Sequence, residues 1–361
     1  MSIALFRGLP STVFVTSLLL APGSTSATAQ QDSSDADGRH APRVLFDHHD
    51  PLHLTLTTDL RTLIRDIDST KFEQHPARLT YRTDGGDSAT LDIRVRTRGH
   101  FRRQRKNCRF PPLRLNIKTG DAAETIFAGQ DKLKLVTHCQ NGRKQYAQYV
   151  VLEYLVYRTL NLLTDISFRA RLADVTYVDT EGREDTRTAP GILLESEQEL
   201  VERLGATEVD VQGVSPADID PAYMTLVDVF QYMVGNTDWS VSTLHNIFLV
   251  DVNFTYYAIP YDFDWTGLVN ARYARPDHRL PIRSVRDRLY RGTCHGPEEL
   301  ATTIALFEER RDTIYALYRD TPELDDGTRR KALNYLDDFY DVIGNRGRAR
   351  RELSSYRCND E

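Results

Sequence analysis

The sequence lacks long apolar runs, CxxC cysteine pairs, a GxGxxG loop and any large excess of one charge. Its N-terminal apolar run, VFVTSLLLAP (13–22), is too short for a comfortable membrane span. Without CxxC pairs, a structural zinc site is disfavoured. The net charge of −6 gives no reason to expect nucleic acid as a partner. What remains is an ordinary globular composition, 40% hydrophobic and 27% charged.

The N-terminal residues have the features of a secretory signal peptide. Arg7 supplies a positive charge before the apolar run, and ATA (27–29) fits the small-x-small cleavage pattern. We expect residues 1–29 to be a cleaved signal peptide and the polar residues 30–42 to be a disordered leader. The protein is therefore expected to be secreted or periplasmic, with no transmembrane segment after signal cleavage.

The first part of the chain is predicted to be mostly β-structure. Alternating apolar and polar residues recur from 43 to about 145, with a hairpin signal at DGGD (84–87). Apolar residues at helical spacing predict a buried helix over 149–163. Two further segments, 171–179 and 191–195, are again typical of strands.

The second part is predicted to be mostly helical. Helices are expected at 196–205, 221–236, 297–320 and 328–343. A β-hairpin over 246–260 interrupts them. This order of elements is that of a protein kinase, so we predict an α+β, two-lobed protein-kinase-like fold in residues 43–361. The β-rich N-lobe would cover about 43–195 and the helical C-lobe about 196–361.

Four cysteines in an exported chain fit two disulfide bonds, with three possible pairings. We favour Cys108–Cys139 and Cys294–Cys358, because each pair would hold one end of the chain to its own lobe.

Acidic and amide side chains lie at the two ends of the predicted hairpin. Asp238 and Asn246 come before it, and Asp262 and Asp264 follow it in the run YDFD. Hard divalent cations prefer oxygen ligands. In protein kinases, a loop Asp accepts the substrate proton while an Asn and another Asp hold the metal. We therefore predict Asp238 as the catalytic base and Asn246, Asp262 and Asp264 as metal ligands.

The spacing of the first two residues departs from the kinase pattern. Asp238 and Asn246 are eight positions apart, against five in the kinase catalytic loop. Either the loop carries an insertion of three residues, or His245 is the base instead. The structural alternative is that Asp238 caps a turn while Asp262 and Asp264 bind a structural Ca²⁺ or pair with arginine.

Together, these motifs resemble the spore-coat protein H (CotH) family of secreted atypical protein kinases. The features that carry the resemblance are Arg98-Gly99 with the basic and aromatic run after it, CRFPPLRLNIK (108–118), GILLES (191–196) and the D…HN…IPYDFD run (238–264). The match spans about 95–265. It implies binding of ATP with Mg²⁺ or Mn²⁺ and phosphorylation of Ser or Thr in protein substrates.

The resemblance also implies a set of cofactor-binding residues. Glu153 would be the helix Glu that orients a phosphate-binding cation, and Glu195 the strand-end Glu. Arg114 stands where kinases have lysine, with Lys134 nearby, although Arg and Lys differ in shape and hydration. Both could instead lie on an exposed strand face. The basic run 97–106 could cradle phosphates, bind an acidic substrate or be a solvated loop.

Three functions remain open at this point. The first is a secreted CotH-like kinase. The second is a pseudokinase that binds nucleotide and metal as a binding module, which the stretched Asp–Asn spacing and the scarcity of ATP outside the cytoplasm favour. The third is a metal-dependent hydrolase that uses the same aspartates, although no HExxH motif is present.

Overall fold

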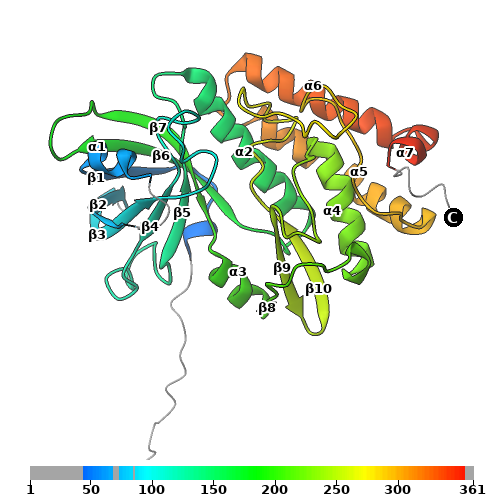
Figure 1. The fold of residues 1–361 in the computed structure, drawn as a ribbon, viewed down its shortest axis with the longest axis horizontal. Helices are drawn as coiled ribbons and strands as arrows, with labels where there is room; N and C mark the ends of the chain where they lie inside the picture. The colour runs from blue at the N-terminus through cyan, green and yellow to red at the C-terminus, as the bar shows by residue number, and fades with distance from the viewer. Residues whose placement is uncertain (1–43, 68–72, 84–85, 354–361) are drawn as a thin grey trace, which may run out of the picture. The chain divides into compact units, whose positions relative to one another are not determined.

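The computed structural model describes residues 44–67, 73–83 and 86–353, which belong to one compact unit (Figure 1). The predicted signal peptide (1–29) and leader (30–42) lie outside the described residues.

Seven strands form a closed barrel in the order β1-β2-β3-β4-β5-β7-β6. Their bounds are β1 Leu52–Thr58, β2 His75–Arg82, β3 Ser88–Thr97, β4 Leu113–Asn116, β5 Lys132–Val136, β6 Ala170–Asp179 and β7 Arg187–Leu194. Neighbouring strands are antiparallel except β1 and β6, which pair in parallel from Leu52↔Ala173 to Thr58↔Asp179. Side chains alternate between the two faces of a strand, so the inward-facing side chains, many of them Leu, Ile and Val, fill the barrel.

The described residues also form helices and a small second sheet, most of which lie on one side of the barrel (Figure 1). The helices are α1 Leu60–Arg65, α2 Lys144–Leu163, α3 Glu197–Leu204, α4 Pro221–Val234, α5 Pro297–Arg319, α6 Asp326–Ile343 and α7 Arg346–Glu352, with 3-10 turns at Val44–Phe46 and Pro216–Asp218. The second sheet contains β8 Thr207–Glu208, β9 Ile247–Val252 and β10 Thr255–Pro260. In Figure 1, α2 runs between the barrel strands and helices α4, α5 and α6.

The prediction of a two-lobed protein-kinase-like fold is wrong. The β-rich segment is a closed mixed barrel of seven strands, and a hydrophobic cluster of its own fills the interior. A second hydrophobic cluster joins α2 and the later helices to barrel residues such as Val136, Ile192 and Leu194. Local alternation predicts strands, but barrel closure depends on the parallel β1–β6 pairing between strands far apart in the sequence.

The predicted Cys108–Cys139 disulfide is confirmed, with 4.7 Å between the Cα atoms. Disulfides form in oxidising compartments, so this bond is consistent with an extracytoplasmic protein. The predicted Cys294–Cys358 bond involves Cys358, which lies outside the described residues. None of the helices in the described ranges has both the length and the hydropathy needed to cross a bilayer.

Candidate functional site

The β9–β10 hairpin brings three of the predicted site residues together at its open end. Strand pairing runs to Ile247↔Pro260, and the Tyr261 N–H extends it by donating to the Asn246 carbonyl over 3.1 Å. Asp262 follows directly. The Asn246 side-chain amide donates to the backbone carbonyl of Asp238 over 2.7 Å and to its Oδ2 over 3.2 Å. Asp238 and Asn246 are therefore neighbours despite their wide spacing in the sequence.

A short turn accommodates the extra residues between Asp238 and Asn246. Ser240 and His245 exchange two backbone hydrogen bonds of 2.9 and 3.0 Å, so the intervening residues loop out. The His245 Nε2 lies 2.9 Å from Asp238 Oδ1, and both side chains are partly exposed to solvent. Asp238 and its alternative as the base, His245, thus form a single hydrogen-bonded pair.

Two of these residues have an unusual backbone conformation. Asn246 has φ 51° and Asp262 has φ 62°, both in the left-handed region. Such conformations cost a side-chain-bearing residue about 1 kcal/mol or more, and they cluster at functional sites. Their occurrence at both sides of one hairpin end is consistent with a binding site there.

Arg102 connects the hairpin to helix α2 and was not predicted as a site residue. Its guanidinium is buried and forms three ion pairs, to Glu153 Oε2 at 3.3 Å, Asp262 Oδ1 at 3.2 Å and Asp264 Oδ2 at 3.4 Å. From the resemblance, Glu153 was expected to orient a phosphate-binding cation, and Arg114 stands where kinases have that cation. In the structure the partner of Glu153 is Arg102, from the basic run after β3. Composition marks that run as basic but does not show which arginine turns inward.

One positive charge is shared here among three carboxylates. Burial disfavours the charged guanidinium, but Asp264 and Glu153 outweigh this and raise the pKa of Arg102. Burial raises the pKa of Asp264 well above its usual range, against the lowering effect of Arg102, and raises the pKa of Glu153 to about 7. The Tyr273 hydroxyl also donates to Asp264 over 2.9 Å. The guanidinium is thus firmly charged, while the carboxylates are only partly neutralised.

The raised pKa of Glu153 predicts a pH-dependent stability. Between the unfolded value of 4.5 and the folded value of about 7, the folded protein holds a proton that the unfolded chain has released. The free energy of unfolding should therefore fall as pH rises through this window, with on the order of 3 kcal/mol due to Glu153. We expect the free energy of unfolding of Glu153→Gln to fall less between about pH 5 and about pH 8 than that of the wild type. Denaturant unfolding at the two pH values measures this difference. The exposed Glu181→Gln is the control, and parallel pH curves for Glu153→Gln and the wild type would contradict the prediction.

A row of cations lies across the outer face of the barrel beside this cluster. Arg96, Arg114 and Lys134 are register partners on β3, β4 and β5, and Arg98 follows β3. Lys134 forms an ion pair with Glu197. In the described part of the chain, neither the Arg98 nor the Arg114 guanidinium has a carboxylate within ion-pair distance, and the Arg114 Nε is buried without a hydrogen bond. Positive charge is therefore in excess on this face.

The pKa values reflect this excess. Burial and the neighbouring Arg102 and Arg114 lower the pKa of Arg98, although Asp262 acts in the opposite direction. Burial also lowers the pKa of Lys134, only partly offset by Glu197. A bound anion would relieve both effects, because it would supply the negative charge that these side chains lack.

A small cavity separates the cations from the hairpin end. Its lining includes Arg98, Lys134, Tyr157, Tyr261 and Asp262, and its volume of about 20 Å³ is space for one water molecule. The Asp262 N–H donates to the Tyr157 hydroxyl over 2.9 Å, which fixes the backbone at this wall. A phosphate group can enter only if side chains such as Arg98 and Tyr261 move.

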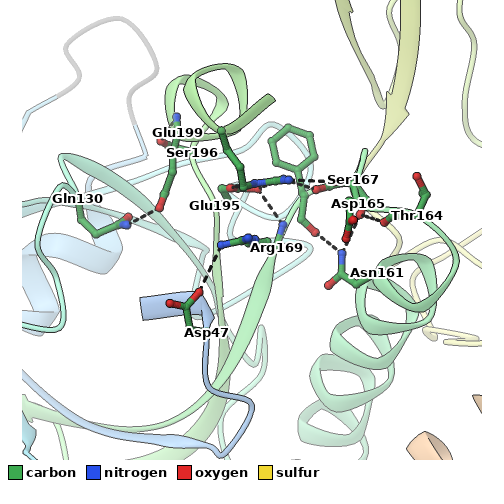
Figure 2. Close-up of polar contacts among 12 residues, drawn as sticks. Asp47, Gln130, Asn161, Thr164, Asp165, Ser167, Arg169, Glu195, Ser196 and Glu199 are labelled. Atoms are coloured by element: carbon green, nitrogen blue, oxygen red, sulfur yellow. Dashed lines mark hydrogen bonds and ion pairs between the residues drawn. The ribbon is translucent and has the colours of Figure 1, made fainter. Parts of the chain in front are cut away.

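Glu195 makes contacts of a different kind (Figure 2). It is buried, and its two oxygens accept hydrogen bonds from the Arg203 guanidinium at 2.7 and 2.9 Å and from the Arg169 N–H at 3.0 Å. These contacts join the end of β7 to α3 and to the start of β6. Both oxygens are therefore occupied by protein donors, although Glu195 borders the cavity.

The predicted metal ligands are not equally available to a cation. The Asp262 side chain is 47% exposed, and the Asn246 amide nitrogen is used by Asp238, which leaves its oxygen for a ligand. Asp264 is buried between Arg102 and Tyr273. Oxygen ligands suit Mg²⁺ or Mn²⁺, so Asp262 with Asn246 fits such an ion better than Asp264 does.

Elsewhere in the described ranges, one group of three His, Cys, Asp or Glu residues has ligand atoms within 4.8 Å of one another. It consists of Asp66, Glu73 and His75. This group belongs to the α1–β2 connection and not to the hairpin site.

No protein-family model matches the chain, and no curated protein matches it. The case for a function therefore depends on the geometry of the site.

Proposed function

We propose that the protein binds ATP with Mg²⁺ or Mn²⁺ and transfers a phosphate to Ser or Thr hydroxyls of protein substrates outside the cytoplasm. The observation that carries this proposal is the position of Arg98, which has no carboxylate within ion-pair distance among the described residues, in one cavity with Lys134 and the partly exposed Asp262, while Arg114 is the register partner of Lys134. Phosphate oxygens need cationic donors, and a divalent cation needs carboxylate or amide oxygens. Arg98, Lys134 and Asp262 line one cavity, so a cationic donor and a carboxylate are both present there.

Each residue has a defined role in this proposal. Arg98, Arg114 and Lys134 would contact phosphate oxygens, and Asp262 with Asn246 would hold the metal. When bound, the metal would neutralise charge that develops on the phosphate during transfer. Asp238 would accept the proton of the substrate hydroxyl, while His245 and the Asn246 amide keep its carboxylate in place.

A second candidate function is nucleotide binding without turnover. Arg102 already neutralises part of the acidic cluster, and both carboxylate oxygens of Asp238 have hydrogen-bond partners. These contacts favour a binding module over an enzyme. A metal-dependent hydrolase has less support, because Asp264 is buried against Arg102 and is poorly placed to share a metal with Asp238.

A thermal-shift experiment tests the binding step. ATP with Mn²⁺ at about a hundred times the dissociation constant should stabilise the protein by about 3 kcal/mol, which raises Tm by roughly 4 °C in a protein of this size. We expect Asp262→Asn to lose most of this shift, because the metal would lose its carboxylate ligand. The matched control is Asp92→Asn, since Asp92 is exposed on β3. Equal shifts with Mn²⁺ alone and with Mn²⁺-ATP would count against nucleotide binding.

A further inference from the structure

A second charged feature lies between the loop that follows Arg102 and the beginning of α2. A groove of about 440 Å³ is lined there by Arg105, Lys106, Arg109, Arg143 and Tyr146, together with the amides Gln140 and Asn141. We call it the basic groove. It has four cationic side chains and no acidic one in its lining. Within the described residues, none of these four cations has a carboxylate in ion-pair distance, although the whole chain has a net charge of −6.

The groove is built from two segments that are firmly joined. The Cys108–Cys139 disulfide links the loop after β3 to the segment before α2. The Phe110 N–H donates to the Cys139 carbonyl over 2.9 Å, and the Gln140 side chain donates to the Asn107 carbonyl over 2.9 Å. The cations are therefore held near one another by covalent and backbone contacts, in spite of their exposure to solvent.

The N-terminus of α2 adds to the positive charge of the groove. Its N-cap residue, Arg143, makes no side-chain cap, and its first turn contains Lys144 but no acidic residue. The other helices of the described ranges each have a side-chain cap or acidic residues in the first turn. Cations at the positive end of a helix dipole are unfavourable. Departures of this kind from local rules are expected at functional sites.

We propose that the basic groove binds an acidic segment of a partner polypeptide. The four cations supply charge complementarity to Asp, Glu or phosphorylated side chains. The Gln140 oxygen and the Asn141 amide nitrogen, which the contacts to Asn107 and His138 do not use, can pair with peptide backbone groups. Tyr146 is the one aromatic side chain in the lining, so the groove lacks the stacking platform that single-stranded nucleic acid requires. The acidic chain as a whole would also repel a long polyanion, which favours a short acidic segment. This interaction does not depend on phosphate transfer.

Fluorescence anisotropy with a labelled acidic peptide tests the proposal. The probe is a fluorescein-labelled peptide of about a dozen Glu, Ser and Gly residues, and the full chain is titrated at low salt. We expect the triple variant Arg105→Gln, Arg109→Gln, Arg143→Gln to bind at least about ten-fold more weakly than the wild type. The control triple, Arg65→Gln, Arg330→Gln, Arg350→Gln, makes the same change in net charge on other surfaces and should bind within about two-fold of the wild type. All six side chains are exposed, so both variants should fold.

Two further measurements make the outcome decisive. Replacing both Cys108 and Cys139 with Ser should weaken peptide binding, because the disulfide joins the two sides of the groove. If the triple variant fails to fold, the single Arg109→Gln should still weaken binding measurably. Equal losses in the groove triple and the control triple would overturn the proposal. Tighter binding of a fluorescent single-stranded oligonucleotide than of the acidic peptide would overturn the choice of partner.

Discussion

Replacing Arg102 with methionine is expected to lower the free energy of unfolding by about 3–5 kcal/mol. Methionine keeps much of the length of the side chain but removes the charge that Glu153, Asp262 and Asp264 share. Glu153 and Asp264 are buried, so they would lose their cationic partner in a place that water reaches poorly. Denaturant unfolding at neutral pH measures the loss.

The control for this prediction is Arg105→Met, on the same basic run. Arg105 is exposed, so its replacement should change stability by less than about 0.5 kcal/mol. The cost of Arg102→Met should also shrink in acid, because protonated Glu153 and Asp264 no longer need a cation. A loss below about 1 kcal/mol at neutral pH would show that the three ion pairs do not hold the site together.

Replacing Asp238 with asparagine is expected to lower the rate of phosphate transfer by a factor of about 10² to 10⁴. Asparagine keeps the shape and the contact to Asn246 but cannot accept the hydroxyl proton. Binding of ATP with Mn²⁺ should persist, because Asp262 and the arginines are unchanged. Intact mass spectrometry measures the rate of phosphate transfer, as the gain of phosphate by the protein or by an added acceptor. The thermal shift with ATP and Mn²⁺ measures binding.

His245→Gln separates the two candidates for the base. His245 contacts Asp238 through one hydrogen bond, so its loss should lower the rate less than Asp238→Asn does. If His245→Gln instead lowers the rate of phosphate transfer more than Asp238→Asn does, the histidine is the base. If the wild-type protein binds nucleotide but neither it nor an acceptor gains phosphate, the protein is a nucleotide-binding module.

Elements defined by local patterns were predictable from the sequence. The expected hairpin over 246–260 corresponds to β9 and β10, and the expected helix over 149–163 lies within α2. In both cases the signal is the spacing of apolar residues between neighbours in the chain. Barrel closure was not predictable, because β1 and β6 pair in parallel across more than a hundred residues and nothing in either strand specifies its partner.

The candidate site shows the same division. Asp238, Asn246 and Asp262 could be predicted as neighbours, since a hairpin brings its two ends together. Arg102 could not be selected from its basic run, because its burial depends on the path of the loop against α2. Glu195 was predicted as a cofactor-binding residue from its place at a strand end. In the structure it pairs with Arg203, and this pairing depends on how α3 packs.

A crystal structure with a non-hydrolysable ATP analogue and Mn²⁺ tests the central proposal most directly, because the anomalous signal of manganese locates the metal. We predict that the manganese ion is bonded to the carboxylate of Asp262 and the amide oxygen of Asn246, and that the phosphates contact Arg98 and Lys134. Manganese held only by Asp66, Glu73 and His75, or a nucleotide bound away from the hairpin end, would contradict it.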